Sequence, residues 1–468
     1  MMMFSLALRN LLRNRRRSLT TLSAMIVGVV SMLIFGGYSR NAILATQTGY
    51  VQYQGHLQIQ HKGYFLFGSG NPVAYGISDY QRLIEVVKND PVLKPMLVVI
   101  TPTLRLNGIA GNFANGMSKS VVAAGMVVDE QNKMRKWDDY GSLSYSPAIA
   151  LTNTPDDSTV IGTGVARLLQ LCGPLKLDGC PTADELGTSD KDSDAPAPAA
   201  PANIAALSAL EQANAPKVPA THVELLAASV GGAPNVANLN VVEAQNWGVK
   251  DIDDSLMVMH LDQAQRLVFG NATPQVTAIQ IQLAHTAQIP AATARLNELL
   301  TTQFKGMPLE VLDYETLTPI YQQVIQFFNS MFGVISILIY VIVLFTVGNT
   351  MSMAVVERTA EVGTLRAIGQ QRGGIRAQFI CEGVLLGLIG GALGIAIALP
   401  IAYLINHSGM TWAPPGYSYK YPVMVRVWGD YQLMFGTAFN LAVVAIVSAW
   451  LPANRAAKLD IVDALRHA

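Results

Sequence analysis

The sequence predicts an α-helical membrane protein with four transmembrane helices and a large mixed α/β domain inserted between the first two. Of its 468 residues, 51% are hydrophobic and 14% are charged, whereas about a quarter are charged in soluble domains. Four apolar runs are long enough to cross a bilayer as helices, at residues 18–38, 326–348, 377–405 and 431–451. Residues 39–325 are far too many for a simple loop.

The N-terminal segment, residues 1–17, has the pattern of an amphipathic helix. Its apolar residues recur at helical spacing, at Phe4, Leu8, Leu11 and Leu12. Arginines project from the other side, at Arg9, Arg13 and Arg16. We expect this helix to lie along the cytoplasmic membrane surface, although the same arginines fit a simple positive-inside anchor. A cleaved signal peptide is the alternative for residues 18–38, but the run is long and no clean small-x-small site follows it.

The placement of basic residues predicts the orientation. Clusters of arginine and lysine precede the first apolar run, occupy residues 349–376 and follow the fourth run in residues 452–468. With four spans, all three clusters fall on one side, so both termini are expected in the cytoplasm. The short segment 406–430 carries only Lys420 and Arg426 as basic residues, which fits the opposite side.

Residues 39–325 read as an extracytoplasmic α/β domain. Alternation predicts half-buried strands at His56 to Gln60 and Ala278 to Leu283, and Leu256 to His260 is a less regular candidate. Helical spacing recurs between them, at Tyr80 to Val87, Leu261 to Phe269 and Ile289 to Leu300. Residues 181–220 are rich in Ala, Pro, Asp and Ser and are expected to be a disordered insertion. That insertion is either a tether for a partner or a tolerated surface segment.

Cysteines and other reactive residues indicate no catalytic site. Cys172 and Cys180 flank a short loop in the domain expected outside the cytoplasm, where we predict a disulfide; two unpaired thiols are the alternative. The chain has no Gly-Lys dipeptide and so no Walker A loop, no His-Glu-x-x-His pair and no zinc-ligand spacing. We expect no bound cofactor, no metal site and no catalysis by this chain. Basic residues gather at membrane boundaries, which argues against nucleic-acid binding.

Charged residues appear abruptly after the second apolar run, in residues 349–376. Glu357 and Glu361 lie four residues apart on one helical face, where like charges repel unless a cation intervenes. We therefore expect a basic partner for them, to which Arg358 contributes in part. A merely solvated helix end is the alternative.

This segment resembles the signature of the FtsX/MacB/LolC group of ABC-transporter permeases. The residues that match in order are Asn349, Thr350, Met351, Glu357, Arg358, Glu361, Val362, Gly363, Leu365, Arg366, Ala367 and Gly369. The likeness continues through Phe379 and Glu382 and recurs in the C-terminal stretch from Pro452 to Arg466. It is loose in the middle of the chain. The resemblance implies a site of ATPase coupling, with the residues Glu357, Arg358, Glu361, Gly363, Leu365, Arg366 and Gly369.

The third apolar run has several small-x-x-x-small pairs, which let helices approach closely in lipid. Its glycines are Gly383, Gly387, Gly390, Gly391 and Gly394. They predict packing within the protomer or across a dimer. Glu382, at the start of this run, is expected either in a salt bridge, with Arg376 and the N-terminal arginines as candidates, or in contact with an ATPase.

The family resemblance implies a mechanism without transport through the bilayer. A separate ABC ATPase of the MacB/LolD kind would bind ATP and Mg²⁺, and its closure would move the outer domain through a stalk at Ser39 to Tyr53 and Leu312 to Phe328. A second permease copy, identical or not, completes such a transporter in the bacterial inner membrane. Two function classes remain: lipoprotein extraction or export of periplasmic substrates, with a lipoprotein or a periplasmic adaptor as partner, and FtsX-like activation of a cell-wall hydrolase. The size of the outer domain disfavours the second.

Overall fold

The computed structural model describes residues 9, 13, 15–142, 145–180, 219–414 and 416–459. These residues fall into two compact units. The helical unit contains the described parts of Met1–Ala45, Ile320–Trp412 and Pro422–Ala468, and the α/β unit contains those of Thr46–Pro319 and Ala413–Tyr421. Residues 181–218 of the expected insertion lie outside the described residues, as does most of the expected amphipathic segment 1–17.

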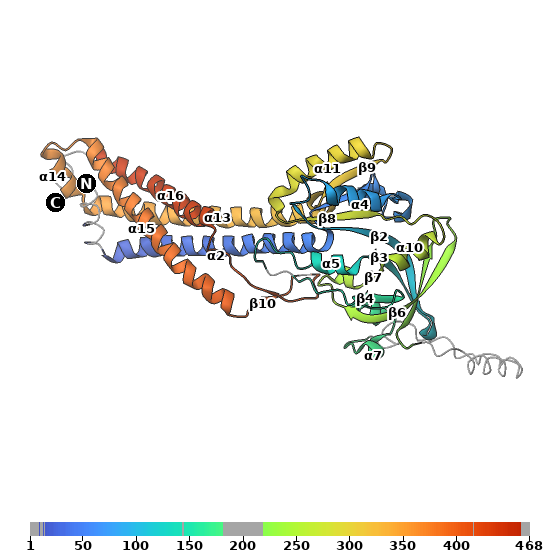
Figure 1. Cartoon of the computed structure of the whole chain (residues 1–468). Coiled ribbons are helices and arrows are strands. Elements are labelled where there is room, and N and C mark those ends of the chain that lie inside the picture. Colours follow the sequence, from blue (N-terminus) through green and yellow to red (C-terminus); the bar gives the residue numbers. More distant parts are fainter. Residues whose placement is uncertain are drawn as a thin grey trace, which may run out of the picture. The chain divides into compact units, whose positions relative to one another are not determined.

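Four long helices dominate the helical unit (Figure 1), namely α2 (Arg15–Gln54), α13 (Pro319–Glu357), α15 (Arg372–His407) and α16 (Tyr431–Ala457). Within the described residues, these four are long and apolar enough to cross a membrane. The helices extend well beyond the apolar runs, because α13 begins seven residues before position 326 and ends nine after position 348. Large apolar side chains are exposed along α13, among them Leu338, Ile342 and Phe345, as expected of a surface that faces lipid.

The second expected stalk segment is wrong in its first part. Leu312 lies in strand β9 (Leu309–Asp313), and the short helix α12 (Tyr314–Leu317) follows it. Helix α13 starts at Pro319, a residue that is tolerated at the first position of a helix because its missing N–H has no partner there. The expected first segment, Ser39 to Tyr53, lies within the continuous helix α2.

The α/β unit is built on a nine-stranded sheet in the order β3-β7-β4-β6-β5-β2-β8-β1-β9. Its strands are β1 (Leu57–His61), β2 (Leu97–Asn112), β3 (Met117–Met126), β4 (Ser158–Gly162), β5 (His222–Ala228), β6 (Pro234–Gln245), β7 (Leu256–His260), β8 (Ala278–Leu283) and β9. Strand β2 also pairs with β3, from Thr103↔Met126 to Asn112↔Met117. This extra pairing closes six strands into a ring. Strand β8 pairs with the first half of β2, Leu97 to Thr103, and β1 and β9 continue the sheet from there.

Helices cover this sheet (Figure 1). They are α3 (Tyr64–Phe67), α4 (Tyr80–Asn89), α5 (Val128–Met134), α6 (Thr163–Leu168), α7 (Cys172–Leu175), α9 (Lys250–Asp253), α10 (Leu261–Phe269) and α11 (Ile289–Gln303), with 3₁₀ turns at Pro72–Tyr75, Phe113–Asn115 and Thr286–Gln288. Helix α10 packs against β2, β3, β5, β6 and β7. Gly125 of β3 leaves no room for a Cβ atom beside Ala264 of α10, so a glycine is needed where the helix approaches the strand.

The strands β1 and β8 differ from the half-buried strands that alternation predicted, because both of their faces are buried. The polar face is a layer of glutamines rather than a solvent face. Gln60 Nε2 donates to Gln58 Oε1 over 2.7 Å, and Gln282 Nε2 donates to the Met134 carbonyl over 2.9 Å. The amide N–H groups of these glutamines can be buried because each donates a hydrogen bond.

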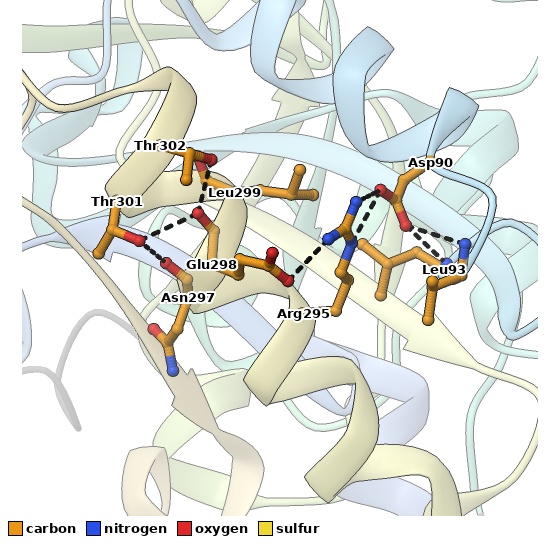
Figure 2. Close-up of polar contacts among 9 residues, drawn as sticks. Asp90, Leu93, Arg295, Asn297, Glu298, Leu299, Thr301 and Thr302 are labelled. Carbon is orange, nitrogen blue, oxygen red and sulfur yellow. Dashed lines mark hydrogen bonds and ion pairs between the residues drawn. The ribbon is translucent and has the colours of Figure 1, made fainter.

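An ion pair joins the two helices α4 and α11 (Figure 2). Arg295 of α11 donates through Nε and Nη2 to Asp90 Oδ2, over 3.0 and 2.7 Å. The other oxygen of Asp90, Oδ1, accepts the backbone N–H groups of Val92 and Leu93. The hydrogen bond from Arg295 leads the effects that lower the pKa of Asp90, and the carboxylate thus fixes the turn that follows α4.

The three cysteines divide into a pair and a single thiol. Cys172 and Cys180 form a disulfide, with their Cα atoms 6.1 Å apart, inside the limit of about 7 Å for such a bond. The bridge closes the loop after α7, as the sequence predicts. Cys381 of α15 is a half-buried free thiol.

Candidate functional site

The connection between α13 and α15 brings the predicted coupling residues together in the helical unit. Helix α13 ends at Glu357, Arg358 leaves helical geometry, and helix α14 (Thr359–Ala367) follows. The inner face of α14 is held by a small apolar cluster, which contains Val355, Val362, Ile375, Phe379, Ala453, Ala456 and Ala457. The connection is therefore packed against the ends of three long helices. A merely solvated helix end does not describe it.

A buried salt bridge fixes the start of α14. Arg358 Nη1 donates to Glu382 Oε1 over 2.7 Å, and the two side chains are 5% and 3% exposed. The sequence indicated a salt bridge for Glu382, with Arg376 and the N-terminal arginines as candidate partners, and the structure shows one with Arg358. Arg358 stands at the break between α13 and α14, and its guanidinium reaches Glu382 of α15. Glu382 therefore acts here as a structural anchor for the connection.

Gly369 ends α14 through a Schellman motif. Its φ angle is +102°, which side chains with a Cβ adopt only with strain. The N–H of Gly369 donates to the Arg366 carbonyl and the N–H of Gln370 donates to the Leu365 carbonyl, each over 3.0 Å. These two bonds satisfy carbonyls that the helix end leaves open, so this glycine sets the direction in which the chain leaves α14.

Two further contacts tie the connection to the chain ends. Arg13 Nη2 lies 2.6 Å from Glu361 Oε1 in an exposed salt bridge, which supplies the basic partner that the pair Glu357 and Glu361 predicted. Arg366 Nη1 donates to the Leu459 carbonyl. Both side chains of this bridge are about half exposed, and such ion pairs contribute little stability.

The outer surface of the connection is apolar as well as charged. Ile368 is 80% exposed, Val356 69% and Leu365 37%. Of these, the sequence singled out Leu365 alone. An apolar residue next to the helix-ending glycine is the signal that could have identified Ile368, because such a position normally packs or binds a partner. Gly363 is buried on the opposite face.

The glycines of α15 serve helix packing within the chain. A Cβ atom at Gly383, Gly387 or Gly391 would press on α16 at Ala449, Ala442 or Ala438, with contacts of 2.8 to 3.1 Å. Gly390 and Gly394 instead approach Met25 and Val29 of α2. Of the two alternatives, these contacts place the glycine packing inside the protomer. The spacing of four residues puts each set on one face of the helix.

No cluster of three or more His, Cys, Asp or Glu side chains that could hold a metal occurs in the described part of the chain. The buried charges of the connection pair with each other, and its exposed residues form a surface rather than a cleft. Such an arrangement has the form of a binding surface for another protein.

Part of this unit is similar to a known protein family. Residues 333–461 match the family model described as FtsX-like permease C-terminal. This match covers α13 from its middle, the connection, α15 and α16. Over these residues the chain is similar to the C-terminal permease domain of FtsX-like proteins.

Several proteins that are similar to this chain are named as ABC transporter proteins. An uncharacterized ABC transporter permease of Methanocaldococcus jannaschii is 26% identical over 46% of this chain and 51% of its own length. The macrolide export ATP-binding/permease protein MacB of Escherichia coli is 29% identical over 41% of this chain and 28% of its own length. The uncharacterized ABC transporter permease YknZ of Bacillus subtilis is 36% identical over 25% of this chain and 26% of its own. The alignments thus span about half or less of these relatives.

One solved structure aligns with part of this chain. The extracellular domain of the ABC-type transporter YknZ from Gram-positive bacteria aligns with 55% of this chain and 99% of its own, at 10% identity. The TM-score of 0.29 is too low to show a shared fold.

Proposed function

We propose that this chain is the permease subunit of an ABC transporter and transmits ATP-driven movement of a separate ATPase to its α/β unit. The observation that carries the proposal is the connection between α13 and α15. It presents exposed Val356 at the end of α13, Glu361 on α14 and exposed Ile368 just after α14. The buried pair of Arg358 and Glu382 anchors this connection to α15. A rigid element with an exposed apolar and charged face is suited to receive a push from a partner.

The remaining parts of the proposal follow from the same assignment. The partner ATPase binds ATP and Mg²⁺, this chain is not catalytic, and a second permease copy completes the transporter. The subunit lies in the bacterial inner membrane with both termini in the cytoplasm. The α/β unit then lies in the periplasm, a compartment in which the disulfide between Cys172 and Cys180 is stable.

The proposed work of the transporter is lipoprotein extraction or export of a periplasmic substrate, with a lipoprotein or a periplasmic adaptor as the further partner. Relatives named as macrolide exporters support an export role. No observation favours activation of a cell-wall hydrolase.

Charge reversal on the connection tests the proposal. The variant Glu357→Lys plus Glu361→Lys and the wild type are purified by an affinity tag from native membranes. Copurifying ATPase is then identified by mass spectrometry through its Walker A sequence. We expect the wild type to retain the ATPase and the variant to lose at least nine-tenths of it, while both remain in the membrane.

A control carries the same charge change elsewhere, with Glu85→Lys plus Asp262→Lys on exposed positions of the α/β unit. This control is expected to retain the ATPase. Full retention by the connection variant would contradict the proposed docking surface, and absence of any ATPase from the wild type would contradict the function itself.

A further inference from the structure

The segment between α15 and α16 contributes to both units. Residues Ala413–Tyr421 belong to the α/β unit, although the helices on either side of them belong to the helical unit. We call residues 413–421 the strap. The backbone of the strap pairs with the α/β unit through an antiparallel β-bridge between Tyr417 and Val249. Lys250 N–H donates to the Gly416 carbonyl over 2.9 Å, and Ser418 N–H donates to the Gly248 carbonyl over 3.0 Å.

A buried carboxylate fastens the strap. Asp253 is 3% exposed. Its Oδ1 accepts a hydrogen bond from the backbone N–H of Trp247, and its Oδ2 accepts one from the hydroxyl of Ser418. The Ser418 hydroxyl also lies 2.8 Å from Asn246 Oδ1. A buried carboxylate is costly unless its oxygens are satisfied, so release of Ser418 would leave an unpaired oxygen inside the α/β unit.

Four tyrosines pack around the same point. Tyr419 of the strap stacks on Tyr145 of the α/β unit with ring centroids 3.9 Å apart and an interplanar angle of 24°. Tyr421 meets Tyr419 and Tyr417 edge to face, at 5.2 and 5.6 Å. Burial raises the pKa of both Tyr417 and Tyr421. Tyr145, Tyr419 and Tyr421 are half-buried by this packing, and detachment of the strap would break the stack between Tyr419 and Tyr145.

Only a very short linker separates the strap from the next anchored residues of the helical unit. Val423 N–H donates to the Met410 carbonyl, and Val425 exchanges two hydrogen bonds with the Asn406 side chain at the end of α15. Val425 and Val427 are buried in the core of the helical unit. Tyr421 is thus the last residue grouped with the α/β unit, and Val423, two residues later, is hydrogen-bonded within the helical unit.

We propose that the strap stays attached to the α/β unit throughout the working cycle and passes movement of α15 and α16 to it. This inference deepens the proposed function and rests on it. Two residues of backbone can extend by only a few ångströms, so a larger displacement of the helix ends must be followed by the α/β unit or must break the attachment. Asp253 is the positioning residue that makes the attachment hold.

Hydrogen exchange of the purified full-length chain tests the attachment without any ATPase. The amides of Lys250 and Ser418 should exchange at least a hundredfold more slowly than unprotected amides. Asp253→Ala plus Ser418→Ala should remove most of this protection. Asp251→Ala, an exposed acid on the same short helix α9, serves as the matched control and should leave it unchanged. Rapid exchange of both amides in the wild type would contradict the attachment of the strap to the α/β unit.

A reversible lock tests whether the strap stays attached during work. Val249 and Tyr417 face each other as a pair not joined by hydrogen bonds, a geometry with close Cα atoms that suits a disulfide. Val249→Cys plus Tyr417→Cys is made in a Cys381→Ala background and oxidised. Wild type treated with the same oxidant and reductant controls for the native bridge.

Transmission of movement to the α/β unit is measured by hydrogen exchange of the amides of that unit. The measurement uses the complex with the copurifying ATPase, with and without ATP. The locked protein should keep the ATP-dependent change of the wild type, whereas Asp253→Ala plus Ser418→Ala should lose at least half of it and still retain the ATPase. Loss of the response in the locked protein, or a full response in the released variant, would refute the inference. A wild type that binds no ATPase would instead count against the proposed function, and the strap would then be judged by its amide protection alone.

Discussion

Arg358 and Glu382 are 24 positions apart in the sequence, and their side chains meet in a salt bridge of 2.7 Å that is almost wholly shielded from solvent. The pair joins the start of α14 to the first turns of α15. Because removal of one partner leaves a buried charge without its counterion, Arg358→Ala or Glu382→Ala should each lower the free energy of unfolding by about 3–5 kcal/mol.

Chemical denaturation of the detergent-purified protein measures this change. The double variant Arg358→Met plus Glu382→Leu restores an apolar contact of similar volume and should recover most of the loss. If the double variant is as unstable as the sum of the single variants, the two residues do not act as a pair.

Ile368 offers a second test of the coupling surface. Ile368→Asp places a charge on a side chain that is 80% exposed, so folding should be little affected. Binding of the partner ATPase should fall at least tenfold if the apolar contact is part of the interface. Leu66→Asp, at a similarly exposed apolar position in α3, is the matched control for pull-down from native membranes. Equal ATPase recovery from the two variants would remove Ile368 from the interface.

Gly387 tests the packing of α15 on α16. A side chain at this position meets the Ala442 backbone at 2.8 Å, so Gly387→Val should destabilise the protein by about 1–3 kcal/mol or more through overpacking. Gly436→Ala in α16 is the control, since nothing lies within 4 Å of its Cβ position. Thermal unfolding in detergent should separate the two variants, and an unchanged midpoint for Gly387→Val would contradict the close approach.

His56 predicts acid sensitivity of the α/β unit. Burial lowers its pKa to about 4, with Asp139 opposing the shift, and its Nδ1 accepts the N–H of Leu283 over 3.0 Å. The folded-state pKa lies below the unfolded value of about 6.5. The unfolded chain therefore binds the proton first, and stability is lost as the pH falls from about 6.5 toward 4, by up to about 3 kcal/mol.

Unfolding temperatures measured between pH 7.5 and 4.5 should show this loss. His56→Asn keeps an acceptor for Leu283 but cannot be protonated, so it should flatten the profile. The neighbouring pair of His285 and Asp139, 2.7 Å apart, also faces His56 through Thr286, and His285→Gln measures its share. A wild-type slope that persists in His56→Asn would assign the sensitivity to another group.

Arg295 should stabilise the α/β unit by holding α4 and α11 together (Figure 2). Arg295→Met removes the hydrogen bonds to Asp90 and leaves that carboxylate buried, so the free energy of unfolding should fall by about 2–4 kcal/mol. Since the pairing lowers the pKa of Asp90, this contribution is present above the unfolded pKa and fades as the pH drops below it. Equal stability of variant and wild type at pH 7 would contradict the role of the pair.

Local patterns predicted a large part of this structure. The strand Ala278–Leu283 and the helix Leu261–Phe269 have the bounds that the sequence indicated, because short-range periodicity determines both. The partner of Glu382, the closure of the sheet through β2 and β3, and the attachment of Ser418 to Asp253 were not predicted. Each depends on residues far apart in the chain, and no local pattern encodes such a meeting. Ile368 was missed because its exposure is a property of the folded surface.

The α/β unit is formed mainly by one long segment, Thr46–Pro319, and the two ends of this segment lie side by side. Gln54 Nε2 donates to Thr318 Oγ1 over 2.7 Å, and β1 runs antiparallel to β9 from Leu57↔Asp313 onward. A segment that starts and finishes at neighbouring points can be exchanged by recombination for another of the same end spacing, without disturbing the helices that carry it. The strap restricts such an exchange. An incoming segment must also provide a hydrogen-bond acceptor for Ser418, as Asp253 does, and an aromatic ring on which Tyr419 can stack, as Tyr145 does.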